Sequence, residues 1–341
     1  MPHKITVKPS GHAFSAEAGE SILDAALREG HTLPYGCRNG ACGVCKGKIL
    51  EGTVDYGDYQ EHALKETEKA EGLALFCCAR PKTDIVIEVH EVAGAQDIQP
   101  KTMPCKVEKI EIVTEDVAVL CLKLPTGERL QFLAGQYIDI LLKDGKRRAY
   151  SLANAPHDDD FLQLHIRRVP DGSFSNQVFT QLHEKAILRF EGPLGSFFLR
   201  EDSDKPILLL ASGTGFAPVK AMLEHAFHHG IGRPITFYWG ANKLADFYMR
   251  ELPEKWVREH ANFKFVPVLS DPVPEDHWQG RTGFLHQSVM ADFADLGGYQ
   301  VYACGSPVMV EAAHNALTAE RGLPPEEFYS DAFTFSSKPK A

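Results

Sequence analysis

The 341-residue chain has no unbroken run of about 18 apolar residues, the length that a transmembrane helix requires. Its N-terminal segment, MPHKITVKPSG, has a basic residue but no apolar run after it, so a secretory signal peptide is not expected. We therefore expect a cytoplasmic protein without a membrane segment. In a reducing compartment, its eight cysteines should be metal ligands, reactive thiols or core residues rather than disulfides.

Basic residues are fewer than acidic ones, 36 Lys and Arg against 46 Asp and Glu, and the net charge is −10. Nucleic-acid binding requires a basic field, so we expect no nucleic-acid partner. The imbalance is uneven, with 10 basic and 14 acidic residues in 1–92, 14 of each in 93–200, and 12 and 18 in 201–341. An acidic first third suits docking onto a basic partner surface, although such an excess also serves solubility alone.

Three successive patterns along the chain predict three domains. The first has short strands, Lys4–Val7 and His12–Phe14, before a helix that starts at Ser21 with Asp24 in the acidic position of a capping box. The second has many short β-type runs separated by glycine turns, which favours a small antiparallel barrel. In the third, strands and helices alternate, as in a doubly wound parallel sheet. A linker with two prolines and no periodicity follows the first pattern, so we expect domains at residues 1–93, 105–201 and 202–341, with the linker at 94–104.

The cysteines are concentrated in one glycine-rich loop. Cys37, Cys42 and Cys45 have the spacing C-x4-C-x2-C, which is typical of one class of [2Fe–2S] site. Three thiolates that reach one compact cluster from a single loop need a tightly curled backbone, and glycines at 36, 40 and 43 permit positive φ angles there. The fourth thiolate comes from Cys77 or Cys78, between which the residues themselves do not decide. A structural zinc site or buried free thiols are the alternatives, although zinc modules usually present two separate ligand pairs.

A possible flavin site begins with Arg148, Tyr150 and Ser151, which follow an apolar strand and a tight turn. The arginine can bind a pyrophosphate in bidentate fashion, the tyrosine ring can lie on an isoalloxazine face, and the serine hydroxyl can hydrogen-bond a ring nitrogen. Taken alone, these residues also fit a charged strand end with a core tyrosine. Three companions favour the flavin: a second cationic strand with His165, Arg167 and Arg168, a turn from Gly172 to Ser175 that opens a helix toward a diphosphate, and Gly192–Gly195, which would close the barrel.

Two glycine loops in the last pattern predict a nucleotide site. The loop S-G-T-G-F-A-P, from Ser212 to Pro218, follows the apolar run Ile207–Ala211 and enters a helix, for whose first turn Pro218 is suited. The loop C-G-S-P, from Cys304 to Pro307, follows a later strand. Both fall at the carboxyl ends of parallel strands, where such sheets bind ligands, although neither has the spacing G-x-G-x-x-G. As a lone cysteine, Cys304 also fits a small core position.

Taken together and in this order, the motifs resemble a known family. The chain looks like a reductase with an N-terminal plant-type ferredoxin domain fused to a ferredoxin–NADP⁺ reductase-like module for flavin and pyridine nucleotide. The resemblance covers nearly all 341 residues. Within that family the chain looks most similar to the CDP-6-deoxy-delta-3,4-glucoseen reductases of 3,6-dideoxysugar synthesis. The reductase components of phenol, toluene and methane monooxygenases share the layout. The resemblance implies a β-grasp [2Fe–2S] ferredoxin domain, an antiparallel FAD-binding β-barrel and a doubly wound NAD-binding domain.

The resemblance also implies roles for individual residues. It assigns the fourth cluster ligand to Cys77, which lies four residues before Pro81. It assigns FAD to Arg148, Tyr150, Ser151, His165, Arg167, Gly172 and Ser175, with Ser151 near the flavin N5. It assigns the nucleotide to Gly213, Thr214, Gly215 and Pro218, with Cys304 and Gly305 guiding the nicotinamide, and a flavin-covering aromatic ring to Phe333. The preceding Asp331 departs from the glutamate that the family often has.

The expected chemistry is electron transfer without a general base. NADH delivers two electrons as a hydride, a [2Fe–2S] cluster accepts one at a time, and flavin is the cofactor that does both. NADH is favoured over NADPH because the segment Gly240–Leu244 lacks the arginine pair expected around a 2′-phosphate. The histidines at one predicted helix end, His225, His228 and His229, are expected on solvated surface.

Three functions compete at this point. The first is a dedicated reductase for a partner enzyme, either a CDP-deoxysugar dehydratase or an oxygenase component. The second is a free-standing flavin or diaphorase-type reductase whose cysteine loop is structural. The third is a non-enzymatic iron–sulfur binding or sensor protein, which must treat the flavin and nucleotide motifs as accidents.

Overall fold

A computed structural model describes residues 2–92, 94, 98–170 and 172–334. The chain divides into two compact units, Met1–Gln99 with Ala332–Ala341, and Pro100–Asp331, and each unit is described by itself. Among the described residues, no helix combines the length and the apolar character needed to cross a membrane.

The first unit is built on a five-stranded mixed sheet with the order β2-β1-β7-β3-β5. Strand β1 pairs in parallel with β7 and antiparallel with β2, and β3 pairs antiparallel with both β7 and β5. Alternate side chains of β1 face the core, since Ile5 and Val7 are fully buried while Lys4 and Lys8 are exposed. The strands are β1 (His3–Lys8), β2 (Ala13–Ala16), β3 (Lys46–Glu51), β5 (Leu73–Leu75) and β7 (Ile85–Glu88), with the short pair β4 (Val54–Asp55) and β6 (Arg80–Pro81) beside them.

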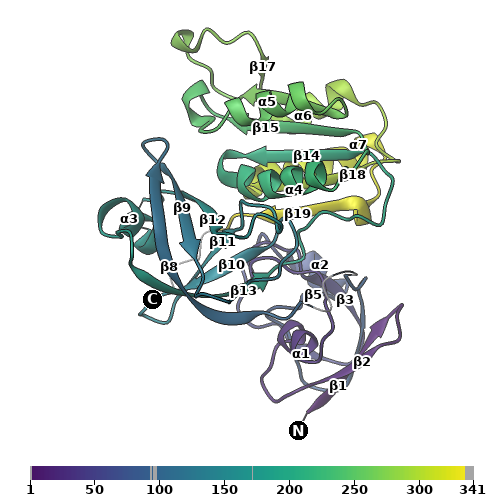
Figure 1. Cartoon of the computed structure of the whole chain (residues 1–341). Coiled ribbons are helices and arrows are strands. Elements are labelled where there is room, and N and C mark those ends of the chain that lie inside the picture. Colours follow the sequence, from purple (N-terminus) through teal and green to yellow (C-terminus); the bar gives the residue numbers. More distant parts are fainter. Residues whose placement is uncertain (1, 93, 95–97, 171, 335–341) are drawn as a thin grey trace. The chain divides into compact units, whose positions relative to one another are not determined.

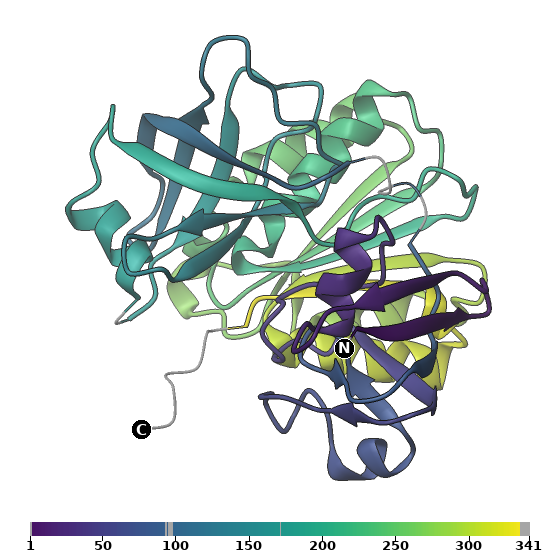
Figure 2. The same cartoon turned by 90° about the horizontal axis from the view of Figure 1, so that it is seen from below.

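Helix α1 (Ile22–Arg28) lies beside β1 and β2 (Figure 2), and the short helix α2 (Glu66–Ala70) precedes β5. The predicted helix start is confirmed, because the Ser21 hydroxyl accepts a hydrogen bond from Asp24 N over 3.1 Å. This bond satisfies one of the amides that a helix leaves unpaired at its first turn. The apolar face of α1 is fully buried against the sheet through Ile22, Leu23, Ala25 and Ala26.

The second unit begins with a six-stranded antiparallel sheet of order β11-β10-β13-β8-β9-β12. The two end strands of this order are joined where Leu152, directly after β11, pairs with Leu164 of β12. Gly192–Gly195, expected to make that closure, instead covers the end of β13, where Leu194 pairs with Tyr137 of β10. The elements are β8 (Lys101–Ile112), β9 (Val117–Lys123), β10 (Tyr137–Leu141), β11 (Arg147–Ser151), β12 (Leu162–Arg167), α3 (Ser173–Thr180) and β13 (Ile187–Leu194).

The expected linker is shorter than residues 94–104. Strand β8 already begins at Lys101, and Pro104 pairs with Arg189 of β13. A proline is tolerated in a ladder where its missing N–H is not needed, so the proline that suggested a linker lies within a strand. Residues 95–97 of this segment lie outside the described part of the chain.

The unit continues with a six-stranded sheet of order β17-β16-β15-β14-β18-β19, whose strands from β17 to β18 pair in parallel. Helices flank these strands (Figure 1). The strands are β14 (Ile207–Ser212), β15 (Ile235–Ala241), β16 (Phe263–Leu269), β17 (Arg281–Thr282), β18 (Gln300–Gly305) and β19 (Phe328–Ala332). The helices are α4 (Phe216–His228), α5 (Glu251–Glu259), α6 (Leu285–Asp292) and α7 (Pro307–Arg321), with one-turn 3-10 helices at Gly213–Gly215, Leu244–Asp246, Pro274–Asp276 and Pro325–Glu327.

The carboxyl ends of β14 and β18 are packed backbone to backbone. A Cβ atom on Gly215 would lie 2.7 Å from the Cys304 carbonyl carbon and closer still to its oxygen. Behind this contact, the Phe216 ring stacks on Trp239 with centroids 4.2 Å apart, and Trp239 Nε1 donates to the Gly213 carbonyl over 3.1 Å. The loop that follows β14 is therefore held from both sides.

We expect Gly215→Ala to lower the stability of the protein by about 1–3 kcal/mol, because the clash is with backbone that cannot rotate away. Differential scanning calorimetry of the full chain measures this as a lower melting temperature. Gly232→Ala is the matched control, since a Cβ atom there meets nothing within 4 Å. Equal melting of the two variants would contradict the packing described for the β14 and β18 ends.

Candidate redox and nucleotide sites

Two of the loop thiols face each other under backbone amides. Cys37 Sγ accepts hydrogen bonds from the N–H groups of Ala41 and Cys42, with N to S distances of 3.4 and 3.3 Å. In return, Cys37 N donates to Cys42 Sγ over 3.4 Å. The pKa of Cys37 falls to about 6, first through the hydrogen bond with the Cys42 thiol and then through the amides of Asn39 and Ala41. These amides favour sulfur in its anionic form, the form that binds iron.

The other thiols approach from two segments. Cys45 and Cys77 are joined by a thiol hydrogen bond, and Cys77 Sγ lies 3.6 Å from Cys78 Sγ. The pKa of Cys77 falls to about 3 through hydrogen bonds with the Cys45 and Cys78 thiols, and the amides of Gly40 and of Cys77 itself add to this. The pKa of Cys78 is raised, first by its hydrogen bond to Cys77 and then by burial. The four sulfurs of Cys37, Cys42, Cys45 and Cys77 thus meet in one place.

The backbone of the loop is curled as its glycines suggest. Gly40 and Gly43 have φ angles of 72° and 78°, while the third positive φ, 57°, belongs to Arg38 rather than to Gly36. A Cβ atom on Gly40 would lie 2.8 Å from Cys78 Sγ and 2.9 Å from Tyr59 Cα. A side chain at position 40 is thus excluded by space as well as by φ.

These residues fit a [2Fe–2S] cluster. Such clusters are held by four thiolates and tuned by amide hydrogen bonds to sulfur, and both features are built into the fold of the first unit. The other three cysteines, Cys105, Cys121 and Cys304, belong to the second unit, where Cys105 and Cys304 are buried and Cys121 is partly buried. The five cysteines of the first unit are therefore those of the loop together with Cys77 and Cys78.

In the second unit, the start of α3 resembles an anion site. Arg148 Nη2 donates to Ser173 Oγ over 3.2 Å, which places its guanidinium beside the first turn of the helix. The cap residue, Gly172, offers no side chain to the first-turn amides, so these remain suited to a phosphate group. The helix begins at Ser173, within the predicted turn, and Ser175 Oγ accepts a hydrogen bond from Val169 N over 3.1 Å. Arg148 and the helix terminus therefore fit one end of a dinucleotide such as FAD.

The aromatic and hydroxyl groups predicted for the flavin lie at the end of β11. Tyr150 packs on Phe174 with ring centroids 5.7 Å apart, and burial raises the pKa of its hydroxyl. Ser151 is 5% exposed and pairs with Tyr137 of β10. Arg148, Tyr150 and Ser151 therefore lie on one strand next to the turn that starts α3.

In the predicted cationic strand, the arginines carry the positive charge and His165 does not. The His165 ring is buried, with Nδ1 2.8 Å from the Tyr248 hydroxyl and Nε2 3.3 Å from Gln163 Oε1. Burial and the charge of Lys220 lower its pKa to about 3, so the ring is neutral. Arg167 does carry charge and pairs with Asp116 over 3.2 Å. A Cβ atom on Gly213 would lie 3.0 Å from Arg167 Nη1, so this arginine reaches the first glycine loop.

The two predicted nucleotide loops lie side by side. Ser212 Oγ, at the end of β14, accepts a hydrogen bond from Ser306 N over 2.8 Å. A Cβ atom on Gly305 would lie 2.5 Å from the Ser212 carbonyl oxygen, and Gly305 has a φ of 125°. Thr214 and Pro218 are buried beside them at the start of α4. Ser212 joins the loops, and sequence analysis gave it no role; its position directly before the glycine loop was the available indication.

The remaining predicted residues lie at or after the neighbouring strands. Cys304 is fully buried at the end of β18, and burial raises the pKa of its thiol, with the Asp331 charge adding to the effect. Phe333 follows β19 and is half-buried. Sequence analysis also missed Lys220, a buried residue of α4 whose Nζ donates to the Ala153 carbonyl over 3.0 Å and pairs with Glu224. A single lysine within an otherwise apolar stretch, Phe216–Leu223, was the indication available there.

Three family models match successive parts of the chain. The 2Fe-2S iron-sulfur cluster binding domain matches residues 5–82, the oxidoreductase FAD-binding domain residues 104–199, and the oxidoreductase NAD-binding domain residues 209–315. The order agrees with the three patterns predicted from the sequence.

Relatives match along nearly the full length. The chain is 43% identical over 333 residues to the CDP-6-deoxy-L-threo-D-glycero-4-hexulose-3-dehydrase reductase of Yersinia pseudotuberculosis, covering 98% of this chain and 99% of the relative. It is 35% identical over 338 residues to the terephthalate 1,2-dioxygenase reductase component 1 of a Comamonas species, covering 98% of each. The crystal structure of the reductase GcoB of Amycolatopsis superimposes with a TM-score of 0.80 at 34% identity, covering 98% of this chain and all of that one.

The three domains, their order and the full-length similarity agree with the thiol cluster and the paired glycine loops. The chain is an oxidoreductase that belongs to the family of iron–sulfur flavoprotein reductases with 2Fe–2S, FAD-binding and NAD-binding domains.

Proposed function

We propose that this chain oxidises NADH and delivers the electrons singly to a partner protein. The observation that carries the proposal is the convergence of the Cys37, Cys42, Cys45 and Cys77 thiols under backbone amides. When bound, FAD exchanges electrons in pairs with a nicotinamide and singly with an iron–sulfur cluster, which carries one electron at a time. The protein supplies binding, orientation and the local electrostatic field.

For the cluster, Cys77 is the better candidate for the fourth ligand. The amides of Gly40 and Cys77 favour the anionic form of its sulfur, whereas the Cys78 thiol is held against Gly40 and its pKa is raised. A cluster whose ligand sulfurs accept hydrogen bonds is easier to reduce, because the donors offset the negative charge that the added electron brings.

For the flavin, we assign the diphosphate to Arg148 and the first turn of α3, with Gly172 and Ser175 shaping that turn. Tyr150 and Ser151 would meet the isoalloxazine, and Arg167 would neutralise charge between the flavin and the glycine loop. His165 would act only through packing, since it is neutral and both ring nitrogens have protein partners. The Leu152 to Leu164 pairing supports describing this six-stranded sheet as a closed FAD-binding barrel.

For the nucleotide, Gly213, Thr214 and Gly215 would hold the pyrophosphate at the start of α4, with Pro218 fixing the first helical turn. Cys304 and Gly305 would border the nicotinamide, and Phe333 would cover the flavin. NADH is favoured over NADPH, because Gly240–Leu244, which ends β15 beside β14, has one lysine and no arginine. We place the domains at residues 1–93, 101–201 and 202–341, with the second starting where β8 begins, and describe the first as a β-grasp ferredoxin and the last as a doubly wound sheet.

For the partner, a CDP-deoxysugar dehydratase is favoured. The relative from Yersinia pseudotuberculosis, 43% identical, is named as a reductase for such a 3-dehydrase, whereas the dioxygenase reductase component of Comamonas is 35% identical. An oxygenase component is the second candidate. The excess of acidic residues in 1–92 supports docking of the partner on the first unit. A diaphorase-type reductase without a protein partner is the third candidate.

We expect Cys77→Ser to lose the iron–sulfur absorbance of the purified protein, while Cys78→Ser retains it. The two residues are adjacent and similar in size, so each variant controls for the other's effect on folding. Flavin absorbance and the iron content per flavin measure the outcome. Loss of the cluster in Cys78→Ser with retention in Cys77→Ser would reverse the ligand assignment.

We expect anaerobic NADH to bleach both the flavin and the iron–sulfur bands of the wild-type protein. In Cys42→Ser, NADH–ferricyanide activity should persist, while reduction of cytochrome c falls at least tenfold, because only the cluster route is removed. Reduction of a purified CDP-deoxysugar dehydratase and of an oxygenase component, compared at equal concentrations, distinguishes the two partners. Full cytochrome c reduction by Cys42→Ser would overturn the proposed electron route.

A further inference from the structure

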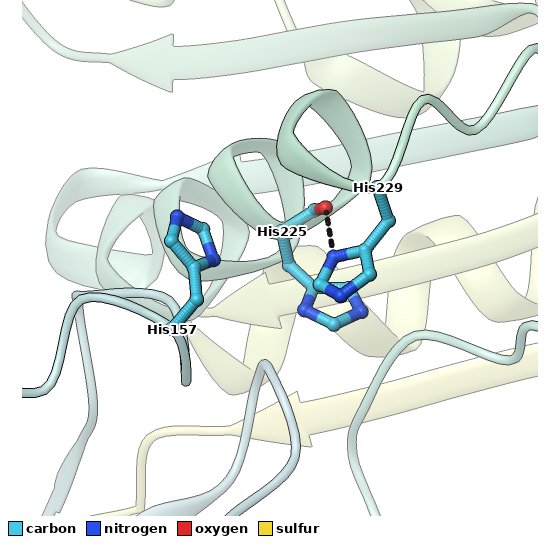
Figure 3. A group of neighbouring side chains, drawn as sticks. All are labelled: His157, His225 and His229. Carbon is cyan, nitrogen blue, oxygen red and sulfur yellow. Dashed lines mark hydrogen bonds between the residues drawn. The ribbon is translucent and has the colours of Figure 1, made fainter.

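A group of histidines at the C-terminal end of α4 has no role in the proposed electron transfer. Figure 3 shows His225 and His229 from the end of this helix and His157 from the segment that follows β11. Their candidate ligand nitrogens all lie within 4.8 Å of one another. The expectation that the helix-end histidines are solvated surface fails for His225, whose side chain is only 12% exposed.

His225 has one nitrogen in a hydrogen bond and one without a partner among the described residues. Its Nε2 lies 2.9 Å from Glu201 Oε1, so the proton on this nitrogen is donated to the carboxylate. Its Nδ1 is buried and has no hydrogen-bond partner among the described residues. A buried nitrogen lone pair without a donor is costly unless something else fills the position.

His229 is arranged in the complementary way. Its Nδ1 donates to the His225 carbonyl over 3.0 Å (Figure 3), and this bond leaves Nε2 as the nitrogen with a free lone pair. A histidine that donates from one nitrogen to a carboxylate or carbonyl and presents the other is the usual arrangement around a bound metal ion. Two successive turns of one helix supply this arrangement twice, at positions i and i+4, which share a face.

The third imidazole, His157, comes from a different part of the second unit. It stacks on His228 with ring centroids 3.7 Å apart and an interplanar angle of 11°. Its segment is fixed to α4 by the bond from Lys220 Nζ to the Ala153 carbonyl. A tetrahedral ion with metal–nitrogen bonds of about 2.0–2.1 Å needs nitrogens about 3.4 Å apart. Side-chain rotations that move each of these nitrogens by about 1 Å bring the distances between them from within 4.8 Å to about 3.4 Å.

A second group with histidines lacks this property. In the first unit, Glu91 Oε2 lies 2.8 Å from His12 Nδ1 and Glu91 Oε1 lies 3.2 Å from His31 Nδ1. Both carboxylate oxygens are thus already paired with the imidazoles, and the group is satisfied without an ion.

We propose that His157, His225 and His229 form a binding site for a divalent transition metal ion of the zinc class, with Glu201 as the carboxylate that orients His225. Three imidazoles suit zinc, nickel or copper rather than magnesium or calcium, which prefer oxygen ligands. A fourth position stays open to water on the exposed side of the group, as in three-histidine zinc sites. The bound ion joins the segment after β11 to α4, and therefore joins the flavin-binding sheet to the nucleotide-binding sheet.

The test is calorimetric titration of zinc chloride into the full-length protein with cluster and flavin in place. We expect saturable binding of one ion per chain. His157→Gln and His229→Gln should weaken it at least tenfold, and Glu201→Gln about tenfold. His183→Gln is the matched control, because that histidine is an exposed residue of the same unit outside the group and should leave binding unchanged. NADH–ferricyanide activity without zinc, equal in all variants, verifies folding.

The visible spectrum recorded after titration verifies that zinc has not entered the cysteine site. Absence of binding at millimolar zinc would overturn the proposal. The proposal would also be overturned if His157→Gln and His229→Gln left zinc binding unchanged, or if His12→Gln removed it. In either case the ion would occupy another group.

Discussion

The sites of this protein depend on backbone that approaches more closely than a side chain would permit. In the first unit, Gly40 lies against Cys78 Sγ and Tyr59 Cα, and this contact closes the loop that brings the thiols together. In the second, Gly215 lies against the Cys304 carbonyl, which keeps the ends of β14 and β18 adjacent. The group of thiols and the paired glycine loops are thus positioned first by main-chain geometry. The charges and hydrogen bonds act on positions that this geometry has already fixed.

The flavin-binding and nucleotide-binding sheets are connected through a few polar contacts. Arg167 of β12 lies against Gly213, and His165 of the same strand bonds to Tyr248. Lys220 of α4 donates to the Ala153 carbonyl directly after Leu152, which pairs the two end strands of the flavin-binding sheet. Buried polar groups of this kind are costly when unpaired, so each fixes one relative position of the two sheets. Hydride transfer needs such fixed positions, because it requires two rings in close contact.

Sequence alone predicted the features that depend on local spacing. Cys37, Cys42 and Cys45 lie in one loop, and the glycine loops directly follow apolar strands, so short-range pattern was enough for them. The sequence could not decide between Cys77 and Cys78, because these adjacent residues lie at nearly the same distance along the chain from the cysteine loop. They differ in which backbone amides their sulfurs meet. The sequence also gave no sign that His165, grouped with two arginines, is neutral, since this neutrality comes from burial against Tyr248, 83 residues away. The meeting of His157 with His225 and His229 likewise depends on the pairing of distant segments.

Helix α4 has its N-terminus in the nucleotide loop and its C-terminus among the histidines. Its 13 residues make a rod about 20 Å long, which bends little because Phe216, Val219 and Leu223 are fully buried along it. The helix thus connects the glycine loop proposed for the nucleotide to the partly exposed histidine group proposed for the metal. If a bound ion at one end strengthens nucleotide binding at the other, the bound nucleotide strengthens ion binding by the same free energy. With both proposed sites filled, occupancy by the metal and occupancy by the reduced nucleotide would be linked through one helix.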